Sequence, residues 1–167
     1  MTGRVLGALA ALCLTVALPA PAAAQGIQCV AFARAHSLVR LAGNARDWWA
    51  RAMGTYARGQ APEKGAVLAF RGTSAMPMGH VAVVAKVLDA RHVLLDHANW
   101  SRRGMVERGA MAVDVSAAGD WSAVRVWHAQ SGSLGLRASP AFGFIYPMAE
   151  AALATASLGA SSLERAR

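Results

Sequence analysis

Long hydrophobic runs are absent from the chain after its first 24 residues. The longest run, residues 5–18, has 14 residues, whereas a membrane-spanning helix needs about 20. Arg4 precedes this run, and the small residues Ala22 and Ala24 follow it. This layout is typical of a secretory signal peptide cut after Ala24. We therefore expect export to the periplasm or the extracellular side of a bacterial cell envelope, with no stable membrane insertion after cleavage.

Cysteine is also scarce, since the 167 residues contain two, Cys13 and Cys29. Two cysteines exclude a small scaffold held together by several disulfides. Cys13 lies inside the predicted signal peptide, so its removal leaves Cys29 without an intramolecular partner. An odd cysteine in an exported protein indicates intermolecular pairing or a free thiol. The alternative is a buried cysteine that packs as a small hydrophobic residue.

Acidic residues are few, with 9 Asp and Glu against 17 Lys and Arg. Removal of the leader takes Arg4 away and leaves a net charge of about +7. A basic exported protein suits an anionic setting such as cell-wall polymers or lipid headgroups. The sequence has no nucleic-acid recognition motif and no dense basic run, so we expect no nucleic-acid partner.

The hydrophobic pattern of residues 25–147 predicts one α+β domain. Residues 28–42 and 44–59 have helical spacing, with Asn44 as the expected cap of the second helix and Asp47 three positions later. Shorter apolar runs rich in β-branched residues then predict an antiparallel meander. The predicted strands are residues 66–70, 80–88, 92–100, 111–115, 123–127 and 143–147. The Ala-rich residues 148–167 are expected to form a C-terminal helix or a tail.

Cys29 falls in the first turn of the first predicted helix. The helix dipole and the unpaired N–H groups there favour a thiolate, so we expect a lowered pKa for Cys29. The same N–H groups point to where an oxyanion forms during acyl transfer. This position favours a nucleophile over a structural cysteine.

A thiol nucleophile needs a base, and the base needs an orienting partner. Among the five histidines, His80 opens an apolar strand directly after Gly79, which leaves room for a close approach to the ring. The hairpin that follows pairs residue 88 with residue 92, which brings His97 near residue 83 and Asn99 near residue 81. Asp96 alternates to the opposite face. His36, His92 and His128 are interpreted as structural or solvated.

A zinc site is the alternative use of these side chains. Cys29, His80 and His97 are acceptable ligands, with Asp96 as a possible fourth. Their spacing matches no zinc signature, because the sequence lacks CxxC, HxxxH and HExxH. We therefore expect no metal and no cofactor.

Four segments in order, "QC" at a helix start, "PEKGAVLAF", "GHVAVV" and "HANW", resemble the CHAP domain. This family contains cysteine- and histidine-dependent amidohydrolases and peptidases related to the NlpC/P60 group. The resemblance covers about residues 26–128. It implies a papain-like core, with N-terminal helices packed on an antiparallel sheet or half-barrel.

The resemblance also implies roles for individual residues. Cys29 matches the nucleophile, and His80 matches the general base that supports the thiolate. Many members carry Glu-x-Asn-Trp, whose glutamate orients the histidine, and His97 stands in its place here. His97 and Asn99 are then expected to hold the ring of His80, with Asp96 as the fallback for His97. Gln28 matches a glutamine that helps to hold the oxyanion.

Together these features predict an exported, monomeric cysteine hydrolase that cleaves an amide bond of peptidoglycan through a thioester. Two alternatives remain open. One is a non-catalytic envelope module that keeps the fold for binding. The other is a cysteine amidase or peptidase that acts on an amide outside peptidoglycan.

Overall fold

The computed structural model describes residues 28–148 of the chain. The predicted signal peptide, residues 1–24, lies outside the described residues, and so does the predicted tail apart from Met148. Within residues 28–148, no helix combines the length and the apolar character needed to cross a membrane.

Strands make up most of the described chain. There are two short α-helices, one 3-10 helix and eight strands in residues 28–148. In chain order these are α1 (Cys29–His36), η1 (Ala45–Asp47), α2 (Trp48–Arg51), β1 (Arg58–Gly59), β2 (Val67–Phe70), β3 (His80–Val87), β4 (His92–Ala98), β5 (Val106–Asp114), β6 (Ala123–His128), β7 (Ser133–Leu134) and β8 (Ser139–Ile145).

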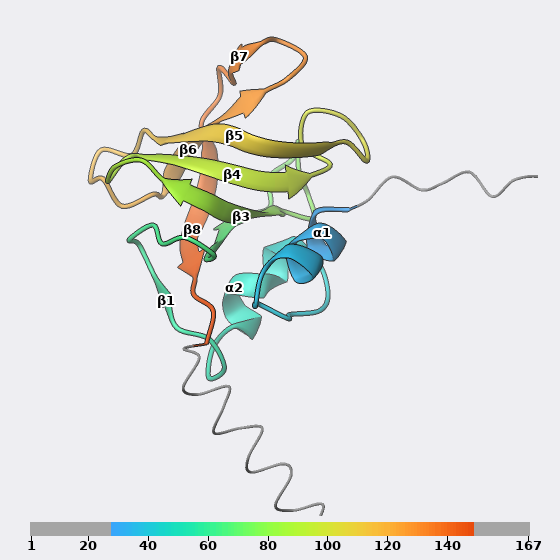
Figure 1. Cartoon of the computed structure of the whole chain (residues 1–167), viewed down its shortest axis with the longest axis vertical. Helices are drawn as coiled ribbons and strands as arrows, with labels where there is room; N and C mark the ends of the chain where they lie inside the picture. Colours follow the sequence, from blue (N-terminus) through green and yellow to red (C-terminus); the bar gives the residue numbers. More distant parts are fainter. Residues whose placement is uncertain (1–27, 149–167) are drawn as a thin grey trace, which may run out of the picture.

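The strands form an antiparallel sheet that closes into a barrel (Figure 1). The sheet order is β1-β8-β2-β3-β4-β5-β6-β7, and β8 also pairs with β6, which joins six strands into a closed ring. The prediction of an antiparallel sheet is confirmed, but the open half-barrel is replaced by a closed one. Closure depends on Ser139 and Pro140, which pair with Val124 and Ala123. The predicted strand, residues 143–147, began after these residues, and proline is unfavourable in strand interiors.

Both predicted helices are shorter than their hydrophobic pattern indicated. The first ends at His36, because Ser37 is extended and its Oγ bonds to the carbonyl of Ala33 at 2.8 Å. The second is one 3-10 turn followed by one α-helical turn. Asn44 makes no side-chain capping bond, and Gly54, with φ of 80°, follows the helix. Local side-chain bonds and glycine geometry therefore override the apolar periodicity.

Two buried clusters lie on the two faces of β2 and β3, as the alternation of side chains along a strand requires. The barrel interior contains Leu68, Phe70, Ala82, Val84, Val93, Leu95, Ala112, Trp121, Val124, Val126, Ala141 and Phe144. The outer cluster joins the strand residues Val67, Ala69, Val81, Val83 and Ile145 to Cys29, Ala33, Val39, Ala45, Trp48, Ala52 and Tyr56. Figure 1 shows α1 and α2 on the same side of the barrel.

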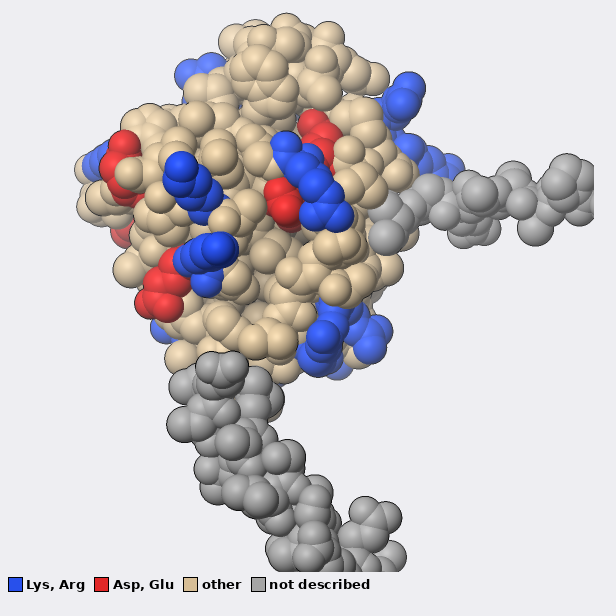
Figure 2. Space-filling model, in the orientation of Figure 1, with Lys and Arg blue, Asp and Glu red and all other residues tan. Residues whose placement is uncertain are grey.

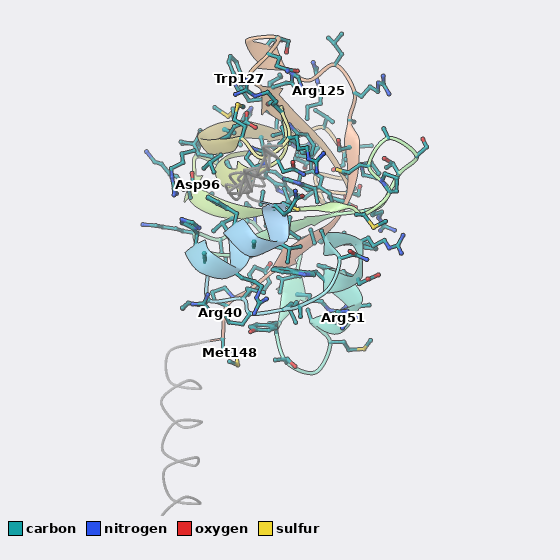
Figure 3. The ribbon with its side chains drawn as sticks, turned by 90° about the vertical axis from the view of Figure 1, so that its right-hand side faces the viewer. Arg40, Arg51, Asp96, Arg125, Trp127 and Met148 are labelled. Atoms are coloured by element: carbon teal, nitrogen blue, oxygen red, sulfur yellow. The ribbon has the colours of Figure 1, made fainter. Side chains whose placement is uncertain are left out.

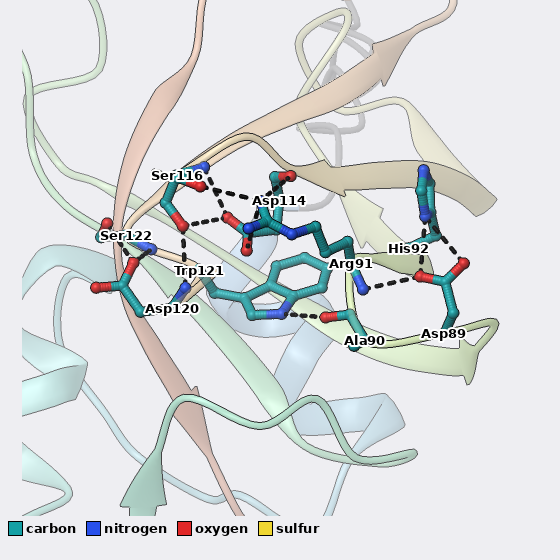
Figure 4. A network of polar contacts seen from close by, with 9 residues as sticks. All are labelled: Asp89, Ala90, Arg91, His92, Asp114, Ser116, Asp120, Trp121 and Ser122. Carbon is teal, nitrogen blue, oxygen red and sulfur yellow. Dashed lines mark hydrogen bonds and ion pairs between the residues drawn. The ribbon is translucent and has the colours of Figure 1, made fainter. Parts of the chain in front are cut away.

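A polar network closes the end of the barrel where β4 begins (Figure 4). The indole of the fully buried Trp121 donates to the carbonyl of Ala90 at 3.0 Å. The buried carboxylate of Asp114 accepts bonds from the N–H and the hydroxyl of Ser116, and Arg91 lies 3.6 Å from it. Oδ2 of Asp114 has the ion pair with Arg91 but no hydrogen-bond partner among the described residues. This end of the barrel is thus held by polar contacts as well as by apolar packing.

Gly79 directly precedes β3 and lies against the backbone of η1. Its φ is 66°, and a Cβ there would lie 2.7 Å from the backbone N of Arg46 and 2.9 Å from the carbonyl oxygen of Phe70. The N–H of Arg46 bonds to the carbonyl of Met78 at 2.8 Å. The glycine therefore makes room for the backbone of η1.

The substitution Gly79→Ala should be much more destabilising than Gly109→Ala. Both glycines have positive φ, 66° and 64°, so each alanine pays about 1–2 kcal/mol for the left-handed backbone. Only Gly79 adds a clash with rigid backbone, because no atom lies within 4 Å of a Cβ at Gly109. We expect a further loss of about 1–3 kcal/mol for Gly79→Ala, measured by urea denaturation. Equal losses in the two variants would contradict the close packing of η1 against β3.

Candidate active site

Cys29 is the first residue of α1 and is buried. Its thiol receives hydrogen bonds from the backbone of Val81, Val30 and Cys29 itself, which lower its pKa. Burial opposes them and has the larger effect, so the pKa of Cys29 is raised above its ordinary value. The sequence-based expectation of a lowered pKa was therefore wrong. Since Val81 directly follows His80, the bond from Val81 places the thiol at the start of β3.

His80 is the first residue of β3 and is only 3% exposed. Its Nε2 lies 3.0 Å from Nδ1 of His97. The rings of Phe70 and Trp100 pack on it, with centroid separations of 5.8 and 4.9 Å. Burial, followed by the charge of His97, lowers the pKa of His80 well below its usual value. The free site therefore holds a neutral thiol and a neutral imidazole at neutral pH, rather than a preformed ion pair.

His97 reaches His80 because a bulge shifts the register between β3 and β4. Near the turn Val87 faces Val93, as the predicted hairpin requires, but after the irregularity between Val84 and Lys86 the partner of Val83 is Asp96. Without this one-residue shift His97 would face Val83, whose side chain belongs to the outer cluster. Because facing residues share a side of the sheet, the shift brings His97 to the side of His80.

Asn99 contacts Gln28 and not the ring of His80. Its Nδ2 donates to Oε1 of Gln28 at 3.0 Å, and its Oδ1 accepts a bond from the N–H of Gly104 at 2.8 Å. Asn99 has φ of 66°, so it has already left the extended backbone of β4. The expectation that Asn99 holds the histidine is replaced by a contact that positions Gln28 beside Cys29. With Oε1 occupied, the Nε2 donor of Gln28 is directed elsewhere.

Asp96 lies on the other side of β4, just above α1 in Figure 3. Its carboxylate accepts bonds from Arg108 at 3.1 Å and from the N–H of Gly109 at 2.8 Å. Both bonds hold it away from His80. The structure thus brings His80 and His97 into contact, places Cys29 against Val81, the residue after His80, and leaves the fallback residue outside this group.

Glu107, on β5, was missed by the sequence-based reasoning. Its carboxylate is buried, and Oε2 lies 3.8 Å from Nε2 of His97. The predicted strand began at residue 111. The structure extends β5 back to Val106. No local motif marks Glu107, since its neighbours in space come from β4 and the following turn.

A groove of about 810 Å³ adjoins the paired histidines. Trp100 lines it and contacts both rings, with centroids 4.9 Å from His80 and 5.8 Å from His97. His128, interpreted above as structural, also lines it. The remaining lining residues are Thr73, Ser74, Ala75, Met76, Asn99, Ser131, Gly135, Leu136, Arg137, Ala138, Ser139 and Pro140. Cys29, His80 and His97 do not line this groove, so Trp100 and Asn99 are the residues that link it to the site.

Residues 28–148 contain no cluster of three or more histidine, cysteine or acidic side chains arranged to hold a metal ion. A buried thiol, a neutral imidazole and backbone N–H groups at a helix start are the components of acyl transfer by a cysteine nucleophile.

The comparison with protein families agrees with these components. The model of the CHAP domain matches residues 20–99, which confirms the predicted resemblance over a shorter range than expected. This family contains cysteine- and histidine-dependent amidohydrolases and peptidases. The matched segment includes Cys29, His80 and His97 and ends before Glu107. No curated protein matches the chain.

The raised pKa of Cys29 predicts slow alkylation in the free protein. At pH 7.5 its reaction with iodoacetamide should be slower than in the same protein unfolded in guanidinium chloride, where the thiol regains its ordinary pKa. The rate should keep rising above pH 9, because burial shifts thiolate formation to higher pH. Peptide mass spectrometry separates the Cys29 product from that of Cys13. A rate that levels off near pH 6 would indicate a preformed thiolate and contradict the neutral pair.

Proposed function

We propose that this protein is an exported cysteine hydrolase that cleaves an amide bond of peptidoglycan through a thioester. One observation carries the proposal: the thiol of Cys29 bonds to the backbone of Val81, directly beside a buried His80 whose ring is bonded to His97. The match of residues 20–99 to the CHAP domain supports the same reaction class.

In the first step, Nδ1 of His80 takes the thiol proton as the sulfur of Cys29 attacks the amide carbonyl. Nε2 of His80 is held by His97, which leaves Nδ1 as the ring nitrogen that would act as the base. A base acting during the attack avoids the cost of keeping a buried thiolate in the resting protein. The carbonyl oxygen becomes an oxyanion beside the first turn of α1, where backbone N–H groups and Nε2 of Gln28 are donors.

In the second step, the C–N bond breaks and the imidazolium of His80 gives its proton to the leaving amine. The acyl group stays on Cys29 as a thioester. A water molecule then attacks the thioester carbonyl while His80 takes one of its protons. The C–S bond breaks, the thiolate regains its proton, and the acyl group leaves as a carboxylic acid. No cofactor enters this sequence of steps.

Charge and the leader support a cell-wall substrate. Residues 1–24 have the layout of a signal peptide, and the remaining chain is basic. Figure 2 shows Lys and Arg at separate places over the visible face. Spread positive charge favours weak, mobile attraction to an anionic polymer over a dedicated recognition patch. The proposed setting is the periplasm or the extracellular envelope, and the proposed form is a monomer.

The proposed domain is papain-like and spans residues 25–147. Its helices would pack on the sheet through the outer cluster, in which Cys29 and Trp48 are buried with Val81 and Ile145. This packing would hold the start of α1, and with it the nucleophile, at the start of β3.

Incubation with purified peptidoglycan tests the proposal. The protein should release fragments whose masses correspond to hydrolysis of one kind of amide bond. Cys29→Ala and His80→Ala should lose this activity by at least about 100-fold. His92→Ala is the matched histidine control, because His92 lies at the opposite end of the barrel beside Asp89, and it should keep full activity.

Two results would overturn the proposal. Equal digestion by the Cys29→Ala variant would exclude the thiol as nucleophile. Digestion of other peptides or amides, with intact peptidoglycan left unchanged, would keep the cysteine hydrolase and exclude the proposed substrate.

A further inference from the structure

We propose that Glu107 is a positioning residue that sets the tautomers of His97 and His80, and so leaves the base free to accept the proton of Cys29. This inference rests on the proposed function. The resemblance places a carboxylate at position 97, and here Glu107 on β5 supplies it. His97 lies between this carboxylate and the base, His80.

Glu107 is held rigidly behind His97. Its side chain is buried, and its Oε1 accepts a bond from the hydroxyl of Ser101 at 2.7 Å. Its Oε2 accepts a bond from the N–H of Ser101 at 3.0 Å. The hydroxyl of Ser101 also accepts a bond from the N–H of Ala129 at 2.9 Å, which fixes its direction. The carboxylate therefore has a defined place.

The carboxylate faces a ring nitrogen that has no other partner. Nε2 of His97 is buried without a hydrogen-bond partner among the described residues, and Oε2 of Glu107 lies 3.8 Å from it. At this distance the interaction is electrostatic, and burial strengthens it. A lone pair on Nε2 would be repelled by the carboxylate, whereas an N–H is attracted. Glu107 therefore favours the tautomer of His97 with its proton on Nε2.

This choice determines the tautomer of His80. With its proton on Nε2, His97 has a lone pair on Nδ1, which lies 3.0 Å from Nε2 of His80. The contact then requires His80 to donate from Nε2, because one of the two atoms must carry the proton. His80 keeps its lone pair on Nδ1, the atom that must take the proton of Cys29. The opposite tautomers would place a proton on Nδ1 and block the base.

The two carboxylates near His97 both favour a proton on its ring. Burial lowers its pKa to about 4, and the carboxylates of Glu107 and Asp96 each oppose this shift. Asp96 is bonded to Arg108 and Gly109 on the other side of β4. Its charge is therefore partly neutralised, and it makes no contact with Nε2. Of the two carboxylates, Glu107 is the one placed to select the tautomer.

A double-mutant cycle with His97→Glu tests this role. In the natural background, Glu107→Gln should lower kcat/KM on peptidoglycan fragments by about 100-fold, because its amide can donate to Nε2 and reverse both tautomers. In the His97→Glu background a carboxylate contacts His80 directly, and Glu107 only repels it. There Glu107→Gln should raise kcat/KM. A role limited to holding Ser101 would lower activity in both backgrounds and would overturn the proposal.

Imidazole ¹⁵N NMR of the unmodified protein gives a second test, which requires no substrate and no variant. Near pH 7, His80 and His97 should both carry their proton on Nε2. A proton on Nδ1 of either ring would overturn the role of Glu107. If the predicted tautomers are found but peptidoglycan is not cleaved, the proposed substrate fails and the tautomer assignment stands.

Discussion

The contact between Nε2 of His80 and Nδ1 of His97, at 3.0 Å in a buried site, is the interaction on which the arrangement of the site depends. It exists because β3 and β4 lose one residue of register near Ala85. Both rings are buried, and the ring of Trp100 packs against each of them. If the register were regular, the two rings would lie on opposite sides of the sheet, and the thiol of Cys29 would have a base without an orienting partner.

Burial sets the chemistry of this pair as well as its geometry. It raises the pKa of Cys29 and lowers the pKa of both histidines, so the resting site is neutral. Proton transfer is then coupled to attack on the substrate and does not precede it. Forming an imidazolium in a buried site is unfavourable, so the groups that lie next to the ring must stabilise it. The carboxylate of Glu107 on β5 is therefore important to the proposed reaction, although His97 and His80 separate it from the thiol.

The strands were largely predictable from the sequence, because alternation and β-branched runs report burial on one or both faces. The position of Cys29 at a helix start also followed from the pattern. The turn length placed His97 near β3, but its contact with His80 depends on the bulge near Ala85, which the pattern does not predict. The helix lengths did not, since Ser37 and Gly54 end them locally. Barrel closure through Pro140 and the carboxylate of Glu107 were missed, because both depend on partners distant in sequence. The pKa of Cys29 was misjudged because burial depth cannot be read from helix position.

The central claim is that the thiol of Cys29 forms the covalent bond to the acyl group. Acid quenching within milliseconds of mixing with saturating peptidoglycan fragments, followed by peptide mass spectrometry, tests it directly. The Cys29 peptide should gain the mass of the acyl portion of the fragment and lose it again on treatment with hydroxylamine, as a thioester does. Turnover during which this peptide stays unmodified at every quench time, or an acyl group on another residue, would contradict the claim.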